Sequence, residues 1–356
     1  MKAWVLDVRT HKLALHDRPY PSPRRGAVVV RVEAAMVLSY MKEVLTGARG
    51  HAFPARDFIP GTNAVGTISS VGDGVHHLAP GQRVFLGPYL VAADPSPDAA
   101  RLLLGHLARF GATGEALQGD WTDGVFAEIV EWPAELATPL DALGAMPSLS
   151  ALGLAKLVVP YGGLLRVGVE AGEIVAVNGA SGFYGSAAVL VALAMGASRV
   201  LAVGRDAATL AGIAERCGPR VVPVVMTGHT ADETRALRAA AGGVGIDAAL
   251  DMIGAKSAST TGSVLRALRR GGRLAMMGSC TEPLEIGFGE MLTNDWLIAG
   301  QFMYPADAPA RLVRLVASGQ LALSAIDAKA FPLDSLPEAM EAAAQMRGFD
   351  LTALMP

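Results

Sequence analysis

The chain has 356 residues, of which 51% are hydrophobic and 18% are charged. This length suits two domains of ordinary size, and the composition is that of a well-packed globular protein, which excludes a disordered or fibrous chain. The net charge of -3, from 30 basic and 33 acidic residues, provides no broad basic surface, so we expect neither nucleic acid nor a membrane as a partner.

Cysteine content and the N-terminal sequence bear on disulfides, structural zinc and the cellular location of the protein. Cys217 and Cys280 are the two cysteines, too few for a disulfide framework or a multi-cysteine zinc lobe. The start, MKAWVLDVRTHK, alternates apolar and polar residues and predicts a first strand with no signal-peptide run, so we expect a cytoplasmic protein. The apolar stretch 174–204 is broken by Asn178, five glycines and Arg199, which favours buried strand, helix and strand over a membrane span.

Short valine-containing runs punctuated by glycine and proline dominate the first third of the chain. The runs AVVVRVEAA, VGTISSVG, PGQRVF and DGVFAEIVEW predict a β-rich, barrel-like domain. Between them, residues 97–110 (PDAARLLLGHLARF) have a helical period, and we predict a helix there within a long excursion from the sheet.

The middle of the chain alternates strands and helices. From residue 173 it reads EIVAV (strand), NGASGFYG (turn), SAAVLVALAMGA (helix), SRVLAVG (strand) and RDAATLAGIAERCG (helix), followed by GIDAALDMIG, a helix over 263–269 and GGRLAMMGS. These apolar strands predict a parallel sheet covered by helices on both faces. After GQFMYP, two helices are expected at 307–318 and 335–346, with returning strands between them.

A glycine-rich turn lies between the first predicted strand and helix of this region. The turn runs from Gly179 through Ala180, Ser181, Gly182, Phe183 and Tyr184 to Gly185. Glycine allows the backbone to approach a pyrophosphate that the following helix N-terminus stabilises. An ordinary tight turn would need glycine too, but the strand-turn-helix context favours a dinucleotide site.

The end of the next strand discriminates between the two nicotinamide cofactors. An NAD-binding protein places an acidic residue about 20 residues beyond the turn to bind the ribose 2′-hydroxyl. Gly204 stands there and cannot make that bond, whereas Arg205 follows and suits a 2′-phosphate. The alternative is a solvated arginine beside Asp206. We therefore predict NADP(H) as the cofactor.

These motifs together resemble the medium-chain dehydrogenase/reductase superfamily, which includes zinc alcohol dehydrogenases and zinc-free quinone oxidoreductases. The resemblance covers nearly the full chain and is carried, in order, by VVVRVEAA, PGTNAVGTISSVG, PGQRV, GVFAEIVEWPA, AGEIVAVNGASGFYG, GIDAALDMIG and GGRLAMMGS. It implies a fold of class α/β plus β: a GroES-like β-barrel catalytic domain, residues 1–154 and 303–356, with an inserted Rossmann doubly wound parallel sheet, residues 155–302. It also implies an active site between the domains and a homodimer or homotetramer formed through Rossmann sheet edges.

The chain departs from the zinc-binding members of that family at each metal position. Where they carry cysteine, a His-Glu pair and a second cysteine, this sequence has Leu38, Thr62 with Asn63, and Ala155. None of these provides a thiolate, imidazole or carboxylate. The four-cysteine structural zinc lobe is also missing, since residues 90–120 contain no cysteine. We therefore predict no metal and the zinc-free, quinone oxidoreductase-like branch.

Without a Lewis acid, hydrogen bonds must stabilise the developing negative charge and a side chain or water must supply a proton. Tyr40, beside Ser39, occupies the position of the proton-relay hydroxyl in the zinc enzymes, and Asn63 replaces their carboxylate. Both are candidate catalytic residues. Equally, the Tyr40 ring could simply pack and Asn63 could hold a turn, and Thr62 is expected to be structural.

Further candidates come from family positions around the cleft. Met36, Tyr89, Trp121, Met303 and Tyr304 are predicted to line the substrate pocket, although core packing is the plainer interpretation of each. Tyr184 is expected beside the cofactor. Gly278 and Ser279, at the end of a Rossmann strand, resemble the position that flanks the nicotinamide. The pair His76-His77 is interpreted as solvated surface.

We expect an NADPH-dependent, zinc-independent reductase that transfers hydride to a small activated acceptor, a quinone or an α,β-unsaturated carbonyl. Metal-free carbonyl, alcohol or imine oxidoreduction is the alternative within enzymes. A non-catalytic NADP(H)-binding sensor or structural protein is the alternative from another class.

Overall fold

The computed structural model describes residues 1–94, 96–254 and 257–356, and these form two compact units, each described by itself. Unit 1 comprises Met1–Ala155, Ile326–Met346 and Leu351–Pro356. Unit 2 comprises Lys156–Ala325 and Arg347–Asp350. The sequence-based boundary for the return to the first domain is residue 303, whereas α10, Ala308–Ala317, still belongs to unit 2.

A six-stranded parallel sheet forms the centre of unit 2. Its order is β13-β12-β11-β14-β15-β16, in which the chain starts in the middle, moves outward to one edge and then returns to build the other half. This is the Rossmann order, and it confirms the predicted doubly wound sheet. The strands are β11 (Ile174–Asn178), β12 (Arg199–Gly204), β13 (Val221–Val225), β14 (Ile246–Asp251), β15 (Leu268–Met276) and β16 (Leu297–Gly300).

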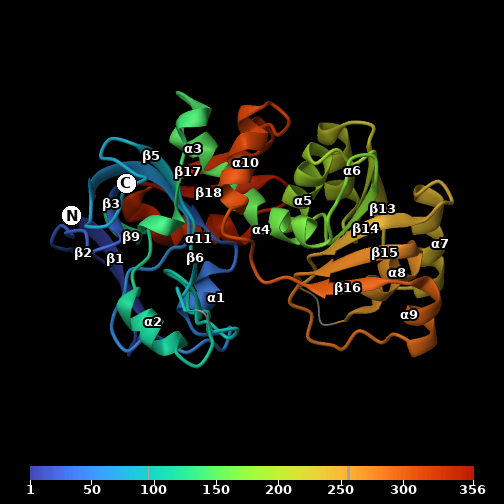
Figure 1. The fold of residues 1–356 in the computed structure, drawn as a ribbon, viewed down its shortest axis with the longest axis horizontal. Coiled ribbons are helices and arrows are strands. Elements are labelled where there is room, and N and C mark those ends of the chain that lie inside the picture. Colours follow the sequence, from blue (N-terminus) through green and yellow to red (C-terminus); the bar gives the residue numbers. More distant parts are fainter. Residues whose placement is uncertain (95, 255–256) are drawn as a thin grey trace. The chain divides into compact units, whose positions relative to one another are not determined.

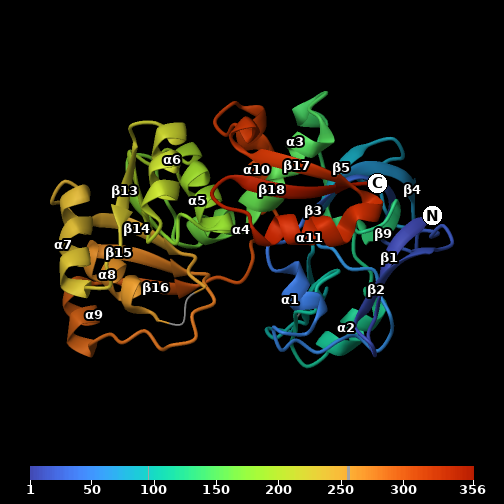
Figure 2. The same ribbon diagram turned by 180° about the vertical axis from the view of Figure 1, so that it is seen from behind.

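Helices cover both faces of this sheet (Figures 1 and 2). Because the sheet is covered on both sides, its central strands are buried along their length, as their continuous apolar runs predict. The helices of unit 2 are α4 (Gly153–Arg166, from its fourth residue), α5 (Phe183–Ala194), α6 (Ala207–Cys217), α7 (Thr230–Ala240), α8 (Ser259–Ala267), α9 (Phe288–Asn294), α10 and the 3-10 helix η3 (Leu323–Ala325).

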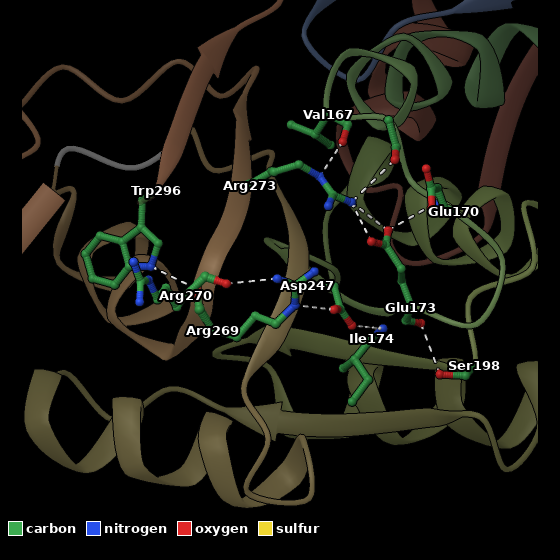
Figure 3. Close-up of polar contacts among 11 residues, drawn as sticks. Val167, Glu170, Glu173, Ile174, Ser198, Asp247, Arg269, Arg270, Arg273 and Trp296 are labelled. Carbon is green, nitrogen blue, oxygen red and sulfur yellow. Dashed lines mark hydrogen bonds and ion pairs between the residues drawn. The ribbon is translucent and has the colours of Figure 1, made fainter. Parts of the chain in front are cut away.

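Ion pairs join the amino ends of three of these strands (Figure 3). The Nη2 group of Arg273 donates to both carboxylate oxygens of Glu173, at 2.7 and 2.6 Å. The Nε group of Arg269 donates to Asp247 at 2.5 Å, and the other oxygen of Asp247 accepts from the N–H of Ile174 at 2.7 Å. These bonds connect β11, β14 and β15 at the amino ends of the strands. Ligands bind to such sheets at the opposite, carboxyl ends.

The main sheet of unit 1 has seven strands in the order β10-β5-β4-β3-β18-β17, with β9 also paired to β3. The β1-β2 hairpin and a small β6-β7-β8 sheet complete the unit. This β-rich architecture confirms the prediction for the first third of the chain. The strands are β1 (Lys2–Asp7), β2 (Lys12–Asp17), β3 (Ala27–Val37), β4 (Ala64–Val71), β5 (Arg83–Leu86), β6 (Tyr89–Val91), β7 (Arg101–Leu103), β8 (Arg109–Phe110), β9 (Ile129–Pro133), β10 (Ala137–Pro139), β17 (Asp327–Pro332) and β18 (Asp350–Met355).

Short helices connect the strands of unit 1. Ser335 precedes the last of them and Pro337 lies in its first turn, as the sequence predicts. The helices are α1 (Met41–Leu45), α2 (Gly114–Asp120), α3 (Ser148–Ala151) and α11 (Leu336–Ala344), with 3-10 turns η1 (Ala134–Leu136), η2 (Asp141–Leu143) and η4 (Leu333–Ser335).

The helix predicted over residues 97–110 is wrong. This segment contains the short antiparallel strands β7 and β8, joined by a turn at Gly105, which has φ of +65°. A Cβ at Gly105 would lie 1.9 Å from the carbonyl oxygen of Gly61. The backbone therefore approaches a distant segment at this glycine, and that tertiary contact overrides the local helical period.

Within the described ranges, one helical stretch, Ser148–Arg166, is long and apolar enough to cross a membrane. Most of it, 72% of the apolar window, is buried within the protein. A buried apolar helix satisfies the same length criterion as a membrane span, so we interpret this stretch as a core helix.

Candidate functional site

A cavity of about 600 Å³ opens at the carboxyl ends of the strands of unit 2. In open α/β sheets this edge is where ligands bind. Four of the predicted cofactor residues, Ser181, Gly182, Gly204 and Arg205, line it. Gly179, the first residue of the predicted glycine turn, lines it too. The sequence interpretation did not assign the other lining residues to the cofactor; they end β11, follow β13 and β14, or lie at the start of α8: Asn178, Met226, Thr227, Gly228, Met252, Ile253, Gly254, Ser257, Ser259 and Thr260.

The glycine turn is held closed by its own backbone. Gly179 has φ of +85°, and its carbonyl oxygen would lie 1.9 Å from a Cβ at Gly185. The N–H of Ala180 donates to Val203 in β12 at 2.9 Å. At Gly182 a Cβ would meet only the Gly179 oxygen, at 3.2 Å. Gly185 thus packs α5 against the turn, while Gly182 keeps the cavity wall smooth where an anion would meet the helix N-terminus.

The last residue of β12 is a glycine, and the carboxylate that follows the strand caps the next helix. Gly204 is buried, and a Cβ there would lie 3.1 Å from the Ser181 hydroxyl oxygen. Asp206 caps α6, where its carboxylate accepts from the N–H and the hydroxyl of Thr209 at 3.1 and 2.7 Å. Arg205 is exposed and lines the cavity. This end of the cavity therefore presents a hydroxyl and a guanidinium.

A buried carboxyl group that the sequence analysis did not single out supports the floor of the cavity. Asp251, 3% exposed, accepts from Thr261 at 2.6 Å, from Asn178 at 2.8 Å and from the N–H of Ile253 at 3.1 Å. Burial raises its pKa, although these three bonds act in the opposite direction. A Cβ at Gly278 would lie 2.9 Å from Asp251 and 2.2 Å from the Ile253 carbonyl, so this close packing requires glycine there.

Phe183, Tyr184 and Ser279 are predicted cofactor residues that are not among the lining residues of this cavity. The rings of Phe183 and Tyr184 meet edge to face with centroids 4.8 Å apart at the start of α5. Ser279 donates its N–H to Ile253 at 2.9 Å, and its side chain approaches Gly254. Gly254 and Ile253 line the cavity, so Ser279 lies directly behind its wall.

The Thr62-Asn63 pair lies in the interior of unit 1. Thr62 and Asn63 are 3% and 4% exposed. The Asn63 side-chain amide donates to the Leu86 carbonyl at 3.5 Å, the limit of a hydrogen bond. The Thr62 hydroxyl has no hydrogen-bond partner within the described residues. A buried hydroxyl without a partner is costly, so this atom marks a place where a ligand or water would bind.

Three glycines bring the 90–120 excursion to this pair. The N–H of Gly61 donates to the Gly105 carbonyl at 3.0 Å, and a Cβ at Gly124 would lie 2.2 Å from the Gly61 oxygen. No side chain would fit at this crossing. The residue after Gly105, His106, is thereby placed next to the PGTN segment, a position that sequence reasoning did not identify.

Aromatic and basic side chains gather around Tyr40. Its ring meets that of His106 edge to face, with centroids 6.2 Å apart, and the Arg49 guanidinium carbon lies 4.0 Å from its ring centroid. The His51 ring lies 5.5 Å from that of His106. Tyr40 itself is half-buried at the start of α1. The structure thus places this candidate in a cluster of polar rings.

His106 is a neutral hydrogen-bond donor. Its Nδ1 accepts from the N–H of Ala108 at 3.0 Å, so the proton of the neutral imidazole is on Nε2. Burial, reinforced by the charges of His51 and Arg49, lowers the pKa of His106 to about 3. Burial and Arg49 also lower the pKa of His51. An uncharged N–H at His106 can stabilise negative charge without exchanging its proton at neutral pH.

The residues at the family metal positions do not fit the ligand chemistry of zinc. Leu38 and Ala155 are buried and apolar, and Thr62 and Asn63 offer a hydroxyl and an amide where zinc prefers thiolate, imidazole or carboxylate. In the part of the chain that the structure describes, no group of three or more His, Cys, Asp or Glu side chains is arranged to hold a metal ion.

The predicted pocket residues belong to different elements of the two units, each described within its own unit. Met36 is fully buried in β3, and Tyr89 is half-buried in β6. Trp121 stacks on Arg24, 4.1 Å from guanidinium carbon to ring centroid, and lines a different cavity of about 350 Å³ in unit 1. Met303 and Tyr304 belong to unit 2, where their backbone packs on α4 at Gly162.

Comparisons with known proteins agree with this architecture. Residues 24–142 match the family model described as alcohol dehydrogenase GroES-like domain, and residues 185–318 match the model described as zinc-binding dehydrogenase. A curated alcohol dehydrogenase from Moraxella sp. (strain TAE123) is 28% identical over 313 residues, 85% of each chain. An L-threonine 3-dehydrogenase from Coxiella burnetii (strain Dugway 5J108-111) is 26% identical over 344 residues, 92% of each.

Solved structures share the fold over the whole chain. Alcohol dehydrogenase TADH from Thermus sp. ATN1 superposes with a TM-score of 0.81 at 24% sequence identity, covering 100% of this chain and 99% of that one. At 24% sequence identity this similarity shows a shared fold and does not by itself show a shared activity.

Proposed function

Because this chain belongs to the medium-chain dehydrogenase/reductase superfamily of oxidoreductases, we propose that it is an NADPH-dependent, zinc-independent reductase. The acceptor is a small activated molecule, a quinone or an α,β-unsaturated carbonyl. The observation that supports this proposal is the donor set of unit 1: a tyrosine, an imidazole N–H, an amide and a buried hydroxyl with no partner among the described residues occur at or near Thr62 and Asn63, the positions that the resemblance aligns with the His-Glu pair of the zinc enzymes.

The end of β12 supports NADPH. A ribose 2′-hydroxyl is bound by a carboxylate in NAD enzymes, and here Gly204 offers none while Asp206 is engaged with Thr209. The Arg205 guanidinium makes no hydrogen bond or ion pair with any residue in the described ranges and lines the cavity. A guanidinium and the Ser181 hydroxyl suit a 2′-phosphate.

The bound nicotinamide would supply a hydride to the β-carbon of the acceptor. The residues of unit 1 would then stabilise the negative charge that develops on the acceptor oxygen, for which neutral donors such as the Thr62 hydroxyl, the Asn63 amide and His106 Nε2–H are suited. The Tyr40 hydroxyl or water would deliver the proton that completes the reduction. Burial strengthens these hydrogen bonds because water does not compete for them.

Turnover with NADPH and a panel of quinones, enones, aldehydes and imines tests the proposal. We expect oxidation of NADPH by a quinone or an enone and a fall of about 100-fold for Tyr40→Phe, the range of general acid catalysis. Tyr20→Phe, at an exposed position, is the matched control and should leave the rate unchanged. Full activity of Tyr40→Phe would exclude Tyr40 as the proton donor.

Metal-free interconversion of alcohols and carbonyls is the second candidate, and the names of the curated relatives favour an alcohol as substrate. The same donors would face a carbonyl oxygen or, with an imine, a nitrogen. Aldehyde or imine turnover in the panel, with no enone or quinone reduction, would establish this candidate instead. Tight NADPH binding with no turnover of any member would indicate the non-catalytic sensor.

We further propose that unit 2 dimerises through β16, the edge strand of its sheet. Apolar side chains beside this edge are exposed: Phe288 at 87%, Leu292 at 67% and Leu297 at 52%. Exposed apolar groups at an unpaired edge favour association with a second copy. Light scattering should report a dimer or tetramer for the wild type and a monomer for Leu297→Lys. The cytoplasmic location stays a prediction.

A further inference from the structure

The segment Arg347–Asp350 belongs to unit 2 although α11 before it and β18 after it belong to unit 1. The N–H of Gly348 donates to the carbonyl of Ser181 in the glycine turn at 3.4 Å. A Cβ at Gly348 would lie 3.6 Å from the Thr209 methyl group in the first turn of α6. The segment therefore packs between the two elements that frame the ribose end of the dinucleotide cavity.

A buried lysine holds this segment in place. Lys156 has no exposed surface, and its Nζ donates to the carbonyls of Gly348 and Asp350, both at 2.8 Å. The hydroxyl of Ser186 in α5 also donates to the Gly348 carbonyl. The ammonium lies 4.0 Å from the ring centroid of Phe183. Burying a charge is costly unless acceptors surround it, so this arrangement specifically fixes the segment against α5.

The fixed segment places Arg347 one residue before Gly348, which packs against Thr209 in the first turn of α6. The N–H of Arg347 donates to the Asp350 carboxylate at 2.8 Å, which closes the turn, while its side chain is exposed. Hydrogen bonds from Thr209 chiefly lower the pKa of Asp206, and the charge of Arg347 contributes to the same shift. Because Gly348 contacts both Ser181 and Thr209, the adjacent Arg347 is close to the α6 cap at Asp206, the residue that follows Arg205.

We infer that Arg347 is a second specificity residue for the cofactor: together with Arg205 it forms a two-arginine site for the 2′-phosphate of NADPH, and Lys156 is its positioning residue. The inference rests on the proposed preference for NADPH. A phosphate carries close to two negative charges and three acceptor oxygens, so two guanidinium groups satisfy it better than one. Arg347 also offsets the like charge that Asp206 would otherwise place beside the phosphate.

Dissociation constants for NADPH and for NADH, measured by fluorescence titration at low salt, test the inference. We expect Arg347→Met to weaken NADPH binding about tenfold, the loss of one charge-assisted contact, and to change NADH binding less than about twofold. Arg270→Met is the matched control. Arg270 is exposed near the amino end of β15, away from the cavity at the carboxyl ends, and pairs with Asp295. This variant should leave both constants unchanged.

Lys156→Met tests the positioning role, because methionine has a similar length and no charge. We expect the ratio of the two constants to fall as it does in Arg347→Met, with thermal melting used to confirm that the variant is folded. An equal loss for both cofactors would overturn the positioning role.

Two further outcomes separate this inference from the proposed function. If the wild type prefers NADPH and Arg205→Met removes the preference while Arg347→Met keeps it, the two-arginine site is wrong and the proposed cofactor stands. If the wild type binds NADH as tightly as NADPH, the proposed preference itself fails and the inference fails with it.

Discussion

At the scale of single residues, Thr62 carries a trade-off between stability and function. Its hydroxyl is buried without a hydrogen-bond partner in the described chain, so Thr62→Val should stabilise the protein by about 1 kcal/mol, the desolvation cost of the unpaired group. If the hydroxyl binds substrate, the same change should lower turnover. Urea denaturation and the NADPH oxidation rate measure the two effects.

Thr67→Val is the control for that substitution. Thr67 lies in β4, which begins two residues after Thr62, and its hydroxyl donates to Glu33 at 2.7 Å. Removing this bond should destabilise the protein by about 1 kcal/mol. A loss of stability in Thr62→Val equal to that of the control would show that the Thr62 hydroxyl is bonded in solution, which contradicts our interpretation.

A second residue, His106, makes stability depend on pH. Its pKa is about 3 in the folded chain and about 6.5 in an unfolded one, so between these values the unfolded state binds the extra proton. The free energy of unfolding is therefore highest, as far as His106 is concerned, above pH 6.5. It falls by about 1.4 kcal/mol for each pH unit below that value, because the unfolded state gains the proton. His106→Asn keeps an acceptor for the Ala108 N–H and removes the titration. Denaturation at pH 7 and pH 5 should therefore show a shallower dependence for the variant, and equal slopes would contradict the assignment.

At the scale of elements, the two glycines of the strand-turn-helix unit have separable roles. A methyl group at Gly185 would overlap the Gly179 carbonyl, so Gly185→Ala should destabilise unit 2 by several kcal/mol through the loss of close turn-helix packing. A methyl group at Gly182 would meet only the Gly179 oxygen, at 3.2 Å, a tight contact that a small backbone shift relieves, and Gly182 lies on the cavity wall. Gly182→Ala should fold normally and bind NADPH at least tenfold more weakly. Thermal melting and NADPH titration distinguish the two variants. Normal NADPH binding by a folded Gly182→Ala variant would show that the cofactor does not contact the cavity wall at Gly182.

The element scale also shows what the sequence could predict. The parallel sheet and the glycine turn depend on contacts between segments that are close in sequence. Apolar runs separated by glycines therefore predict both from the local sequence. The helix predicted over residues 97–110 is wrong because Gly105 packs against Gly61 and Gly124. No local sequence pattern encodes that tertiary contact. A glycine inside a helical period is a warning that could have been weighed there.

At the scale of the whole molecule, the site residues that sequence reasoning missed come from distant parts of the chain. His106 reaches the PGTN segment through the excursion, and Gly348, the residue after Arg347, bonds to the glycine turn at a point where the chain returns to unit 2. Asp251 is a strand residue whose role depends on Asn178 and Thr261 meeting it from other elements. Such convergence is a property of the tertiary fold, whereas the end of β12 could be interpreted from spacing alone.

The central claim is that this member of the superfamily reduces its acceptor with hydrogen-bond donors in place of a metal. The most direct measurement is the NADPH oxidation rate, with the best acceptor of the panel, before and after exhaustive chelation of divalent metals. We predict an unchanged rate, and no gain on addition of zinc, because Leu38, Thr62, Asn63 and Ala155 provide no zinc ligands. A rate that falls on chelation and returns in proportion to added zinc would contradict the account.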